Sequence, residues 1–142
     1  MKRRINKILI VEDNDDHFEI IEFYLKKIKN EVSIQRCADG EEAKKLVNDD
    51  QNTSLDIIML DMNLPKYSGL EVLEDLKKNK RLAIVPVIMF TTSGSDKDVE
   101  TAYQLGVNSY IQKPDDPTGM EKILRSIFSY WEENETVGTR DN

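Results

Sequence analysis

Short apolar runs in this sequence are followed directly by side chains that could do chemistry. Glu12 and Asp13 follow one run, Asp61 follows another, and Thr91 and Lys113 follow two more. Each has an ordinary alternative role, because acids cap helices, Asp begins turns, and threonine or lysine commonly ends a strand at the surface. Taken singly, these alternatives are at least as good as a functional role. Taken jointly, three carboxylates, a hydroxyl and an ammonium form one chemically compatible set.

That set suits metal-assisted phosphoryl transfer. Carboxylates crowded together repel one another unless a cation lies between them. Because only oxygen ligands are on offer, the expected cation is Mg²⁺ or Mn²⁺ and not zinc. The metal could hold a phosphoryl oxygen while a carboxylate attacks phosphorus, and Lys113 and Thr91 would neutralise and hydrogen-bond the remaining oxygens.

These side chains can meet only if the runs before them are strands of one sheet. Apolar and β-branched runs predict buried strands over 7–11, 55–60 and 86–90, with weaker strands over 32–36 and 107–111. Apolar positions spaced by three and four predict helices over 15–29, 39–47, 68–76, 95–106 and 117–131. Asp39, Ser68 and Asp116 fit as N-caps, and Gly106 fits the end of a helix.

Five strands alternating with five helices predict a parallel sheet with helices on both faces, and right-handed crossovers leave few topologies. We therefore expect a doubly wound α/β fold of the flavodoxin-like type, a five-stranded (βα)5 sheet with strand order 2-1-3-4-5. Such sheets bind ligands beyond the carboxyl ends of their strands, where the reactive side chains fall. We expect one domain over residues 1–132, then a polar tail over 133–142 and no output domain.

Composition excludes several other classes of protein. The charge sum, 20 − 27 = −7, argues against nucleic-acid binding, and no apolar run exceeds four residues, so no segment could span a bilayer. With one cysteine and one histidine, neither an internal disulfide nor a zinc site is available. Because no secretory signal is evident, we expect a cytoplasmic location. We interpret His17 as a surface residue and Cys37 as a small buried apolar group.

Four motifs, Ile8–Asp13, Ile58–Pro65 with Gly69, Ile88–Thr92 and Tyr110–Pro114, occur in this order. In this order and spacing they resemble the response-regulator receiver domain of bacterial two-component signalling, and the match runs from Lys7 to about Trp131. Within that family, the segment 64–69 and the aromatic residues near the end are most similar to stand-alone receivers that serve bacterial phytochromes.

The resemblance implies that Asp61 is the phosphorylated aspartate. It would accept a phosphoryl group from a sensor histidine kinase, which the narrower resemblance implies is of phytochrome type. It would lose the group again to water, so the chain would not be a turnover enzyme. Asp13 and Asp61 would bind Mg²⁺ or Mn²⁺ directly, Glu12 would contribute through water, and Asn63 would contribute its backbone carbonyl.

The resemblance further implies a switch. Thr91 and Lys113 would respond to the bound phosphoryl group, and Tyr110 would turn inward when the threonine moves. Lys113–Pro114 would be a cis peptide. The fourth helix, fifth strand and fifth helix would then change, and the protein would signal by contact with a downstream protein target or a phosphorelay member. A homodimer formed on phosphorylation is left open.

The aromatic residues Phe128, Tyr130 and Trp131 allow two interpretations. Aromatic side chains commonly anchor protein interfaces, so the three could form an interaction hot spot. Alternatively, Phe128 and Trp131 fall at helical spacing with the apolar residues before them and could simply pack the last helix onto the sheet.

Two rival functions would use the same side chains. A haloacid-dehalogenase-type phosphatase also combines an Asp nucleophile, Thr or Ser, Lys and Mg²⁺. That family, however, places its nucleophile after the first strand and usually needs a second acid where this chain has Asn63. A phosphate-independent scaffold receiver would have no use for the complete set of Asp13, Asp61, Thr91 and Lys113. We therefore favour a phosphate-accepting response regulator over both.

Overall fold

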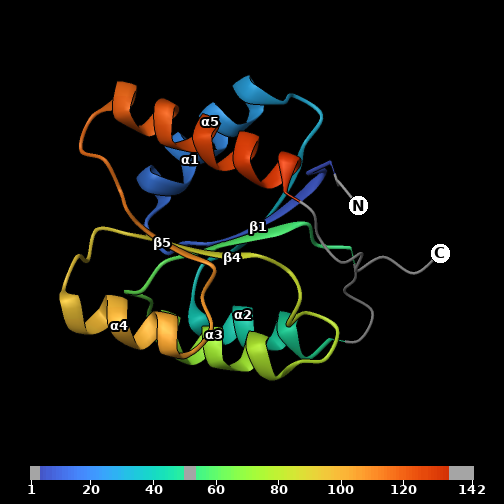
Figure 1. The fold of residues 1–142 in the computed structure, drawn as a ribbon, viewed down its shortest axis with the longest axis vertical. Helices are drawn as coiled ribbons and strands as arrows, with labels where there is room; N and C mark the ends of the chain where they lie inside the picture. The colour runs from blue at the N-terminus through green and yellow to red at the C-terminus, as the bar shows by residue number, and fades with distance from the viewer. Residues whose placement is uncertain (1–3, 50–53, 135–142) are drawn as a thin grey trace.

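The computed structural model describes residues 4–49 and 54–134, which form one sheet flanked by helices (Figure 1). Its five strands are β1 (Lys7–Val11), β2 (Ser33–Cys37), β3 (Ile57–Leu60), β4 (Val87–Thr91) and β5 (Ser109–Gln112). All pairs are parallel and the order is β2-β1-β3-β4-β5. The predicted doubly wound, flavodoxin-like topology is confirmed.

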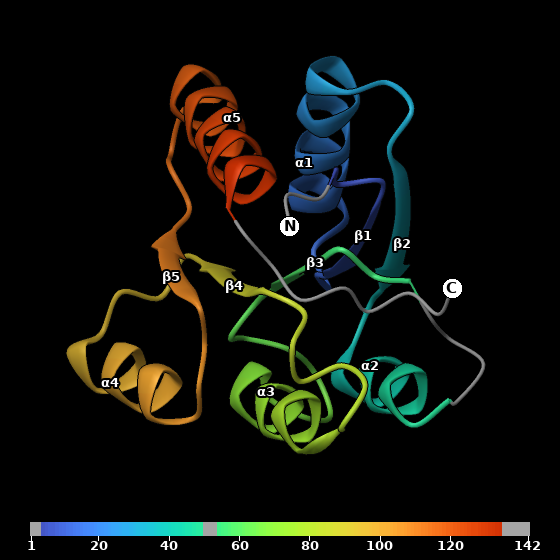
Figure 2. The same cartoon turned by 45° about the vertical axis from the view of Figure 1, so that its right-hand side comes forward.

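The helices that alternate with these strands are α1 (Asp15–Ile28), α2 (Gly40–Val47), α3 (Gly69–Lys78), α4 (Asp96–Gln104) and α5 (Pro117–Glu133). Figure 2 shows α1 and α5 on one face of the sheet and α2, α3 and α4 on the other. The predicted N-caps are confirmed, because the side chains of Asp39, Ser68 and Asp116 each accept a backbone N–H three residues later. Gly106, at φ +99°, follows α4 as expected.

The sheet has a hydrophobic core on each face. Side chains of β1 alternate between them: Ile8 and Ile10 pack with α1 and α5, whereas Leu9 and Val11 pack with α2, α3 and α4. Burial on both faces is why the central strands β1, β3 and β4 appear in the sequence as nearly continuous apolar runs. Cys37 lies in the second of these cores, and burial raises the pKa of its thiol to about 12, so it is the buried apolar group that we expected.

The observed ends of the strands differ slightly from the expected ones. β2, β4 and β5 each end one residue later, and β3 begins two residues later. Immediately before β3, the Asp56 carboxylate accepts the backbone N–H groups of Asn6 and Lys7 at 2.9 Å each. This side-chain contact joins the entries to β1 and β3, and the apolar pattern alone carries no sign of it.

The aromatic residues near the end of α5 divide between core and surface. Phe128 is buried in the core shared with α1, and Trp131 packs against that core. Tyr130 is 60% exposed, and its ring meets that of Trp131 edge-to-face, with centroids 5.0 Å apart. Packing therefore accounts for Phe128 and Trp131. α5 ends at Glu133, and because residues 135–142 lie outside the described residues, the polar tail stays a prediction.

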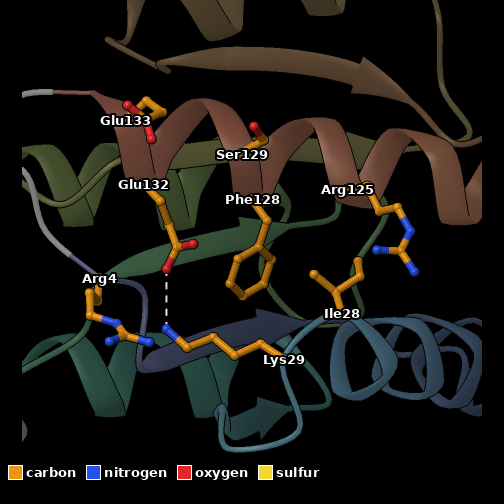
Figure 3. A pocket seen from close by; sticks show the side chains of 8 residues that line it. All are labelled: Arg4, Ile28, Lys29, Arg125, Phe128, Ser129, Glu132 and Glu133. Atoms are coloured by element: carbon orange, nitrogen blue, oxygen red, sulfur yellow. Dashed lines mark hydrogen bonds and ion pairs between the residues drawn. The ribbon is translucent and has the colours of Figure 1, made fainter.

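A cleft of about 500 Å³ lies between the carboxyl ends of α1 and α5, at the opposite end of β1 from the predicted site (Figure 3). The Glu132 carboxylate there accepts hydrogen bonds from the Ile5 backbone N–H (3.0 Å) and the Lys29 ammonium (3.1 Å). These contacts tie the start of β1 to the end of α5, which is a structural role. Within residues 4–49 and 54–134, no helix is both long and apolar enough to cross a membrane.

Candidate functional site

The predicted reactive residues meet at the carboxyl edge of the sheet. β1 and β3 pair in register up to Val11 and Leu60, so the residues that follow them, Glu12 and Asp61, leave the sheet side by side. The Asp61 N–H donates to the Val11 carbonyl (3.0 Å), which continues the ladder into the site. Beyond the ends of β4 and β5, the Lys113 N–H donates to the Thr91 carbonyl (2.8 Å) in the same way.

Three carboxylates form the acidic part of the site. One oxygen from each of Glu12, Asp13 and Asp61 lies within 4.8 Å of the others. Glu12 and Asp61 are buried, whereas Asp13 is exposed. Oxygen ligands in this number and spacing fit a hard divalent cation such as Mg²⁺ or Mn²⁺, which keeps part of its water shell. The cluster could therefore hold the metal that the sequence predicts.

Both oxygens of Asp61 are held by hydrogen bonds. Oδ1 accepts the Thr91 hydroxyl (2.8 Å) and the Asn63 backbone N–H (3.0 Å). Oδ2 accepts the Lys113 ammonium (3.0 Å), which also pairs with Glu12 Oε1. The contact found for Asn63 is thus through its N–H, and the metal-binding role of its carbonyl stays a prediction.

The surroundings of the two buried carboxylates shift their pKa values in opposite directions. Burial raises the pKa of Glu12 to about 7, with the negative charge of Asp61 adding to the effect and Lys113 opposing it. Burial also acts to raise the pKa of Asp61, but hydrogen bonds from Asn63, Lys113 and Thr91 and the lysine charge together lower it below its ordinary value. Asp61 is consequently ionised at neutral pH, the form in which a carboxylate can attack phosphorus.

Thr91 and Tyr110, the predicted switch pair, are linked through Ser93. The Ser93 N–H donates to the Thr91 hydroxyl oxygen (3.3 Å), and the Tyr110 hydroxyl donates to the Ser93 carbonyl (3.0 Å). The Ser93 hydroxyl in turn donates to Asp98 on α4 (2.9 Å). These hydrogen bonds would therefore transmit a movement of Thr91 to both α4 and β5.

The predicted cis peptide at Lys113–Pro114 is wrong, because the described residues contain no cis bond. The trans form is the intrinsically preferred one, by about 0.5–1 kcal/mol for a bond before proline. Lys113 is directed into the site without a cis bond, since its N–H is fixed on Thr91 and its ammonium is held by two carboxylates.

Two residues of the site were missed by sequence reasoning. His17, interpreted above as a surface residue, is half-buried and its Nδ1 lies 3.0 Å from the Lys113 ammonium. Arg36, at the end of β2, donates from Nε and Nη2 to the Glu12 carbonyl (3.1 and 3.0 Å) and from Nη2 to the Asp13 carbonyl (3.4 Å). A basic residue at the carboxyl end of the strand beside β1 was the signal that could have indicated Arg36.

The start of α3 lies directly against the loop that carries Asp61. The Gly69 N–H donates to the Met62 carbonyl (2.9 Å), and a Cβ at Gly69 would lie 2.2 Å from the Asp61 carbonyl oxygen. No side chain fits in that space. The glycine therefore fixes how the Asp61 loop leaves β3.

A buried aspartate beside an acidic pair, a threonine and a lysine, at the carboxyl edge of this fold, is the arrangement of a class of signalling domains. The sequence profile of the response regulator receiver domain matches residues 8–125, most of the chain. The chain therefore belongs to the response regulator receiver domain family, as the four motifs predicted.

Two relatives within this family are similar to the chain over most of its length. The chain is 35% identical over 127 residues to the probable methanogenesis regulatory protein FilR2 of Methanothrix harundinacea, covering 87% of this chain and 82% of that protein. It is also 35% identical over 136 residues to response regulator Rcp1 of Synechocystis, covering 92% of this chain and 91% of Rcp1.

Two solved structures resemble the fold closely. The phosphorylated cyanobacterial phytochrome response regulator RcpA matches with a TM-score of 0.85 and 31% identity, covering 92% of this chain and 96% of that one. The Mn²⁺-bound form of Rcp1 matches with a TM-score of 0.84 and 31% identity, covering 94% and 99%. The predicted likeness to phytochrome response regulators is confirmed.

Proposed function

We propose that this protein is a stand-alone response regulator that accepts a phosphoryl group on Asp61 from the phosphohistidine of a sensor histidine kinase. The observation that carries the proposal is the setting of Asp61. One carboxylate oxygen faces Thr91, the other faces Lys113, and two further acids lie within metal-binding distance. The likeness to the phosphorylated RcpA supports the assignment, and the name of that protein favours a kinase of phytochrome type.

The chain's own residues account for most of the reaction. An oxygen of the ionised Asp61 forms a bond to phosphorus while the bond from phosphorus to the histidine nitrogen breaks, and the imidazole leaves with the electron pair. Lys113 and Thr91 are placed to neutralise and hydrogen-bond the phosphoryl oxygens. Asp13 and Asp61, with Glu12 through water and Asn63 through its carbonyl, would hold Mg²⁺ or Mn²⁺. When bound, the metal supplies positive charge opposite the phosphoryl oxygens.

The acyl phosphate is labile, so the signal ends when water attacks it and releases phosphate and free Asp61. On this proposal the chain accepts a phosphoryl group, its phosphorylated form has a limited lifetime, and it is not a turnover enzyme. The Mn²⁺-bound form of Rcp1 supports a divalent cofactor. We place this activity in the cytoplasm.

Output passes from Thr91 through Ser93 to Asp98 on α4 and Tyr110 on β5. The family resemblance adds α5 to the face that changes. This altered face would bind a downstream protein target or phosphorelay member, and a homodimer formed on phosphorylation is the other outcome to test. The net charge of −7 argues against nucleic acid as the direct partner.

The test is intact-mass spectrometry after incubation with Mg²⁺ and acetyl phosphate. We expect one phosphoryl group on the wild type, lost again on standing, and none on Asp61→Asn or when the metal is chelated. Asp16→Asn, an exposed acid in the first turn of α1, is the matched control and should behave like the wild type. Undiminished uptake by Asp61→Asn would refute the assignment. Steady multiple turnover of a phosphomonoester would instead indicate a phosphatase of the haloacid-dehalogenase type.

A further inference from the structure

The ammonium of Lys113 has a third partner besides Glu12 and Asp61. The Nδ1 atom of His17 lies 3.0 Å from Nζ. His17 belongs to the first turn of α1, where its backbone N–H donates to the side chain of the N-cap residue Asn14 (3.0 Å). The cap thus fixes the turn from which the imidazole reaches the site.

The chemistry of this contact sets the state of the imidazole. An ammonium has three N–H donors and no lone pair, so it can only donate. Its three donors are matched by Glu12, Asp61 and His17, each through one acceptor atom. For this contact to be a hydrogen bond, Nδ1 of His17 must accept, which is the tautomer that carries its ring proton on Nε2. A protonated ring would place an N–H and a positive charge against the ammonium.

A cavity beside this contact contains the groups that the Lys113 ammonium would meet without His17. His17 and Lys113 both line a cavity of about 450 Å³ between α1 and the loop from β5 to α5. The same cavity is lined by three acids, Glu19, Asp115 and Asp116. Without an acceptor at His17, the third N–H of the ammonium would face this cavity, and its acids would compete with Asp61 for the lysine.

We propose that His17 is a positioning residue for phosphoryl transfer, which holds the Lys113 ammonium between Glu12 and Asp61, where it can meet an arriving phosphoryl group. The inference rests on the proposed function and assigns a residue to it. His17 itself acts through Lys113 and contacts neither the acids of the metal cluster nor the reacting oxygen in the described contacts.

The first test needs no phosphate and no variant. His17 is the single histidine of the sequence, so the imidazole ¹⁵N NMR spectrum contains one set of ring signals. We expect the Nε2–H tautomer at mildly alkaline pH. The opposite tautomer, with the proton on Nδ1, would overturn the proposal, because that ring could not accept from Lys113.

The second test compares two substitutions in the acetyl phosphate assay. His17→Leu removes the acceptor, and we expect the rate of phosphoryl uptake to fall about tenfold, the scale of one lost hydrogen bond to a charged group. His17→Asn keeps an acceptor oxygen near Nδ1 and should restore most of the rate. Mg²⁺ affinity should be unchanged in both variants. Glu19→Gln, which alters the same cavity without touching Lys113, is the control and should match the wild type.

The outcomes separate the two proposals. Wild-type uptake with an unchanged rate in His17→Leu, or an equal loss in His17→Asn, would overturn the role of His17 and leave Asp61 as the acceptor. Absence of uptake by the folded wild type would refute the proposed function, and with it any role of His17 in transfer. In that case a ring proton on Nδ1 would also exclude the contact in which His17 accepts from Lys113.

Discussion

Removal of the Lys113 ammonium is the sharpest perturbation of this site. The side chains of Lys113, Glu12 and Asp61 are only 3%, 2% and 8% exposed, so water cannot replace the lost charge. Lys113→Met keeps the apolar stem and removes the ammonium. Two buried carboxylates then face each other, with Asp13 within 4.8 Å, and no cation lies between them.

The expected cost is large compared with the stability of a domain. Breaking a buried ion pair by deleting one partner costs about 3–5 kcal/mol, against a net stability of about 5–15 kcal/mol. The cost depends on pH. Because folding raises the pKa of Glu12 from 4.5 to about 7, the folded protein holds this proton more tightly than the unfolded chain. The associated stability is complete below pH 4.5 and lost as the pH rises through 7. Because Lys113 lowers this pKa, its removal raises the pKa of Glu12 further, and the folded Lys113→Met protein should be least stable at alkaline pH.

The assay is urea unfolding at pH 8 in chelator and again with Mg²⁺. A cation that binds the folded carboxylates stabilises them, so Mg²⁺ should recover more stability in Lys113→Met than in the wild type. Lys78→Met is the matched control, because Lys78 is 74% exposed and its pair with Glu74 contributes at most about 0.5 kcal/mol. A loss below about 1 kcal/mol in chelator, or no extra recovery with Mg²⁺, would refute this account of the buried charges.

Three further predictions concern the supports of the site. Arg36→Met should weaken Mg²⁺ binding, measured by calorimetry, about tenfold, because supporting contacts to ligand residues typically contribute that much. Unchanged affinity would show that the hydrogen bonds from Arg36 to the Glu12 and Asp13 carbonyls do not support the site. Gly69→Ala should cost about 1–3 kcal/mol in urea unfolding, since its Cβ overlaps the Asp61 carbonyl, and a neutral effect would show that α3 can shift freely. Cys37, with its pKa raised to about 12, should resist alkylation at pH 8 until the protein unfolds, and rapid modification of the folded protein, measured by mass, would contradict its burial.

Much of the fold was predictable because its signals are local. A strand covered on both faces is a continuous apolar run, and the helices begin at caps such as Ser68, whose side chain and that of Glu71 form the complete capping box. The placement of Asp61 and Lys113 then follows from topology, because the carboxyl ends of parallel strands share one edge.

What could not be predicted depends on orientation and on contacts between distant segments. Arg36 reaches the Glu12 carbonyl only because β2 lies beside β1, and stacking of its guanidinium on Phe18, 4.6 Å from the ring centre, directs it there. His17 lies in a helix whose periodicity shows which face is buried but not where the first turn points. The peptide before Pro114 was inferred from family resemblance and not from any local constraint, and there the prediction failed.

In the proposed reaction, the geometry favours Asp61 over the other two acids as the nucleophile. Glu12 gives one oxygen to Lys113 and the other to the Asn14 N–H (3.1 Å), and with its raised pKa it is partly protonated at neutral pH. Asp13 is exposed, which suits a ligand that exchanges metal with solvent. Asp61 alone combines burial, ionisation and donors on both oxygens. Neighbouring carboxylates whose surroundings separate their pKa values take different roles, and that separation supports Asp61 as the group that attacks phosphorus in the proposed reaction.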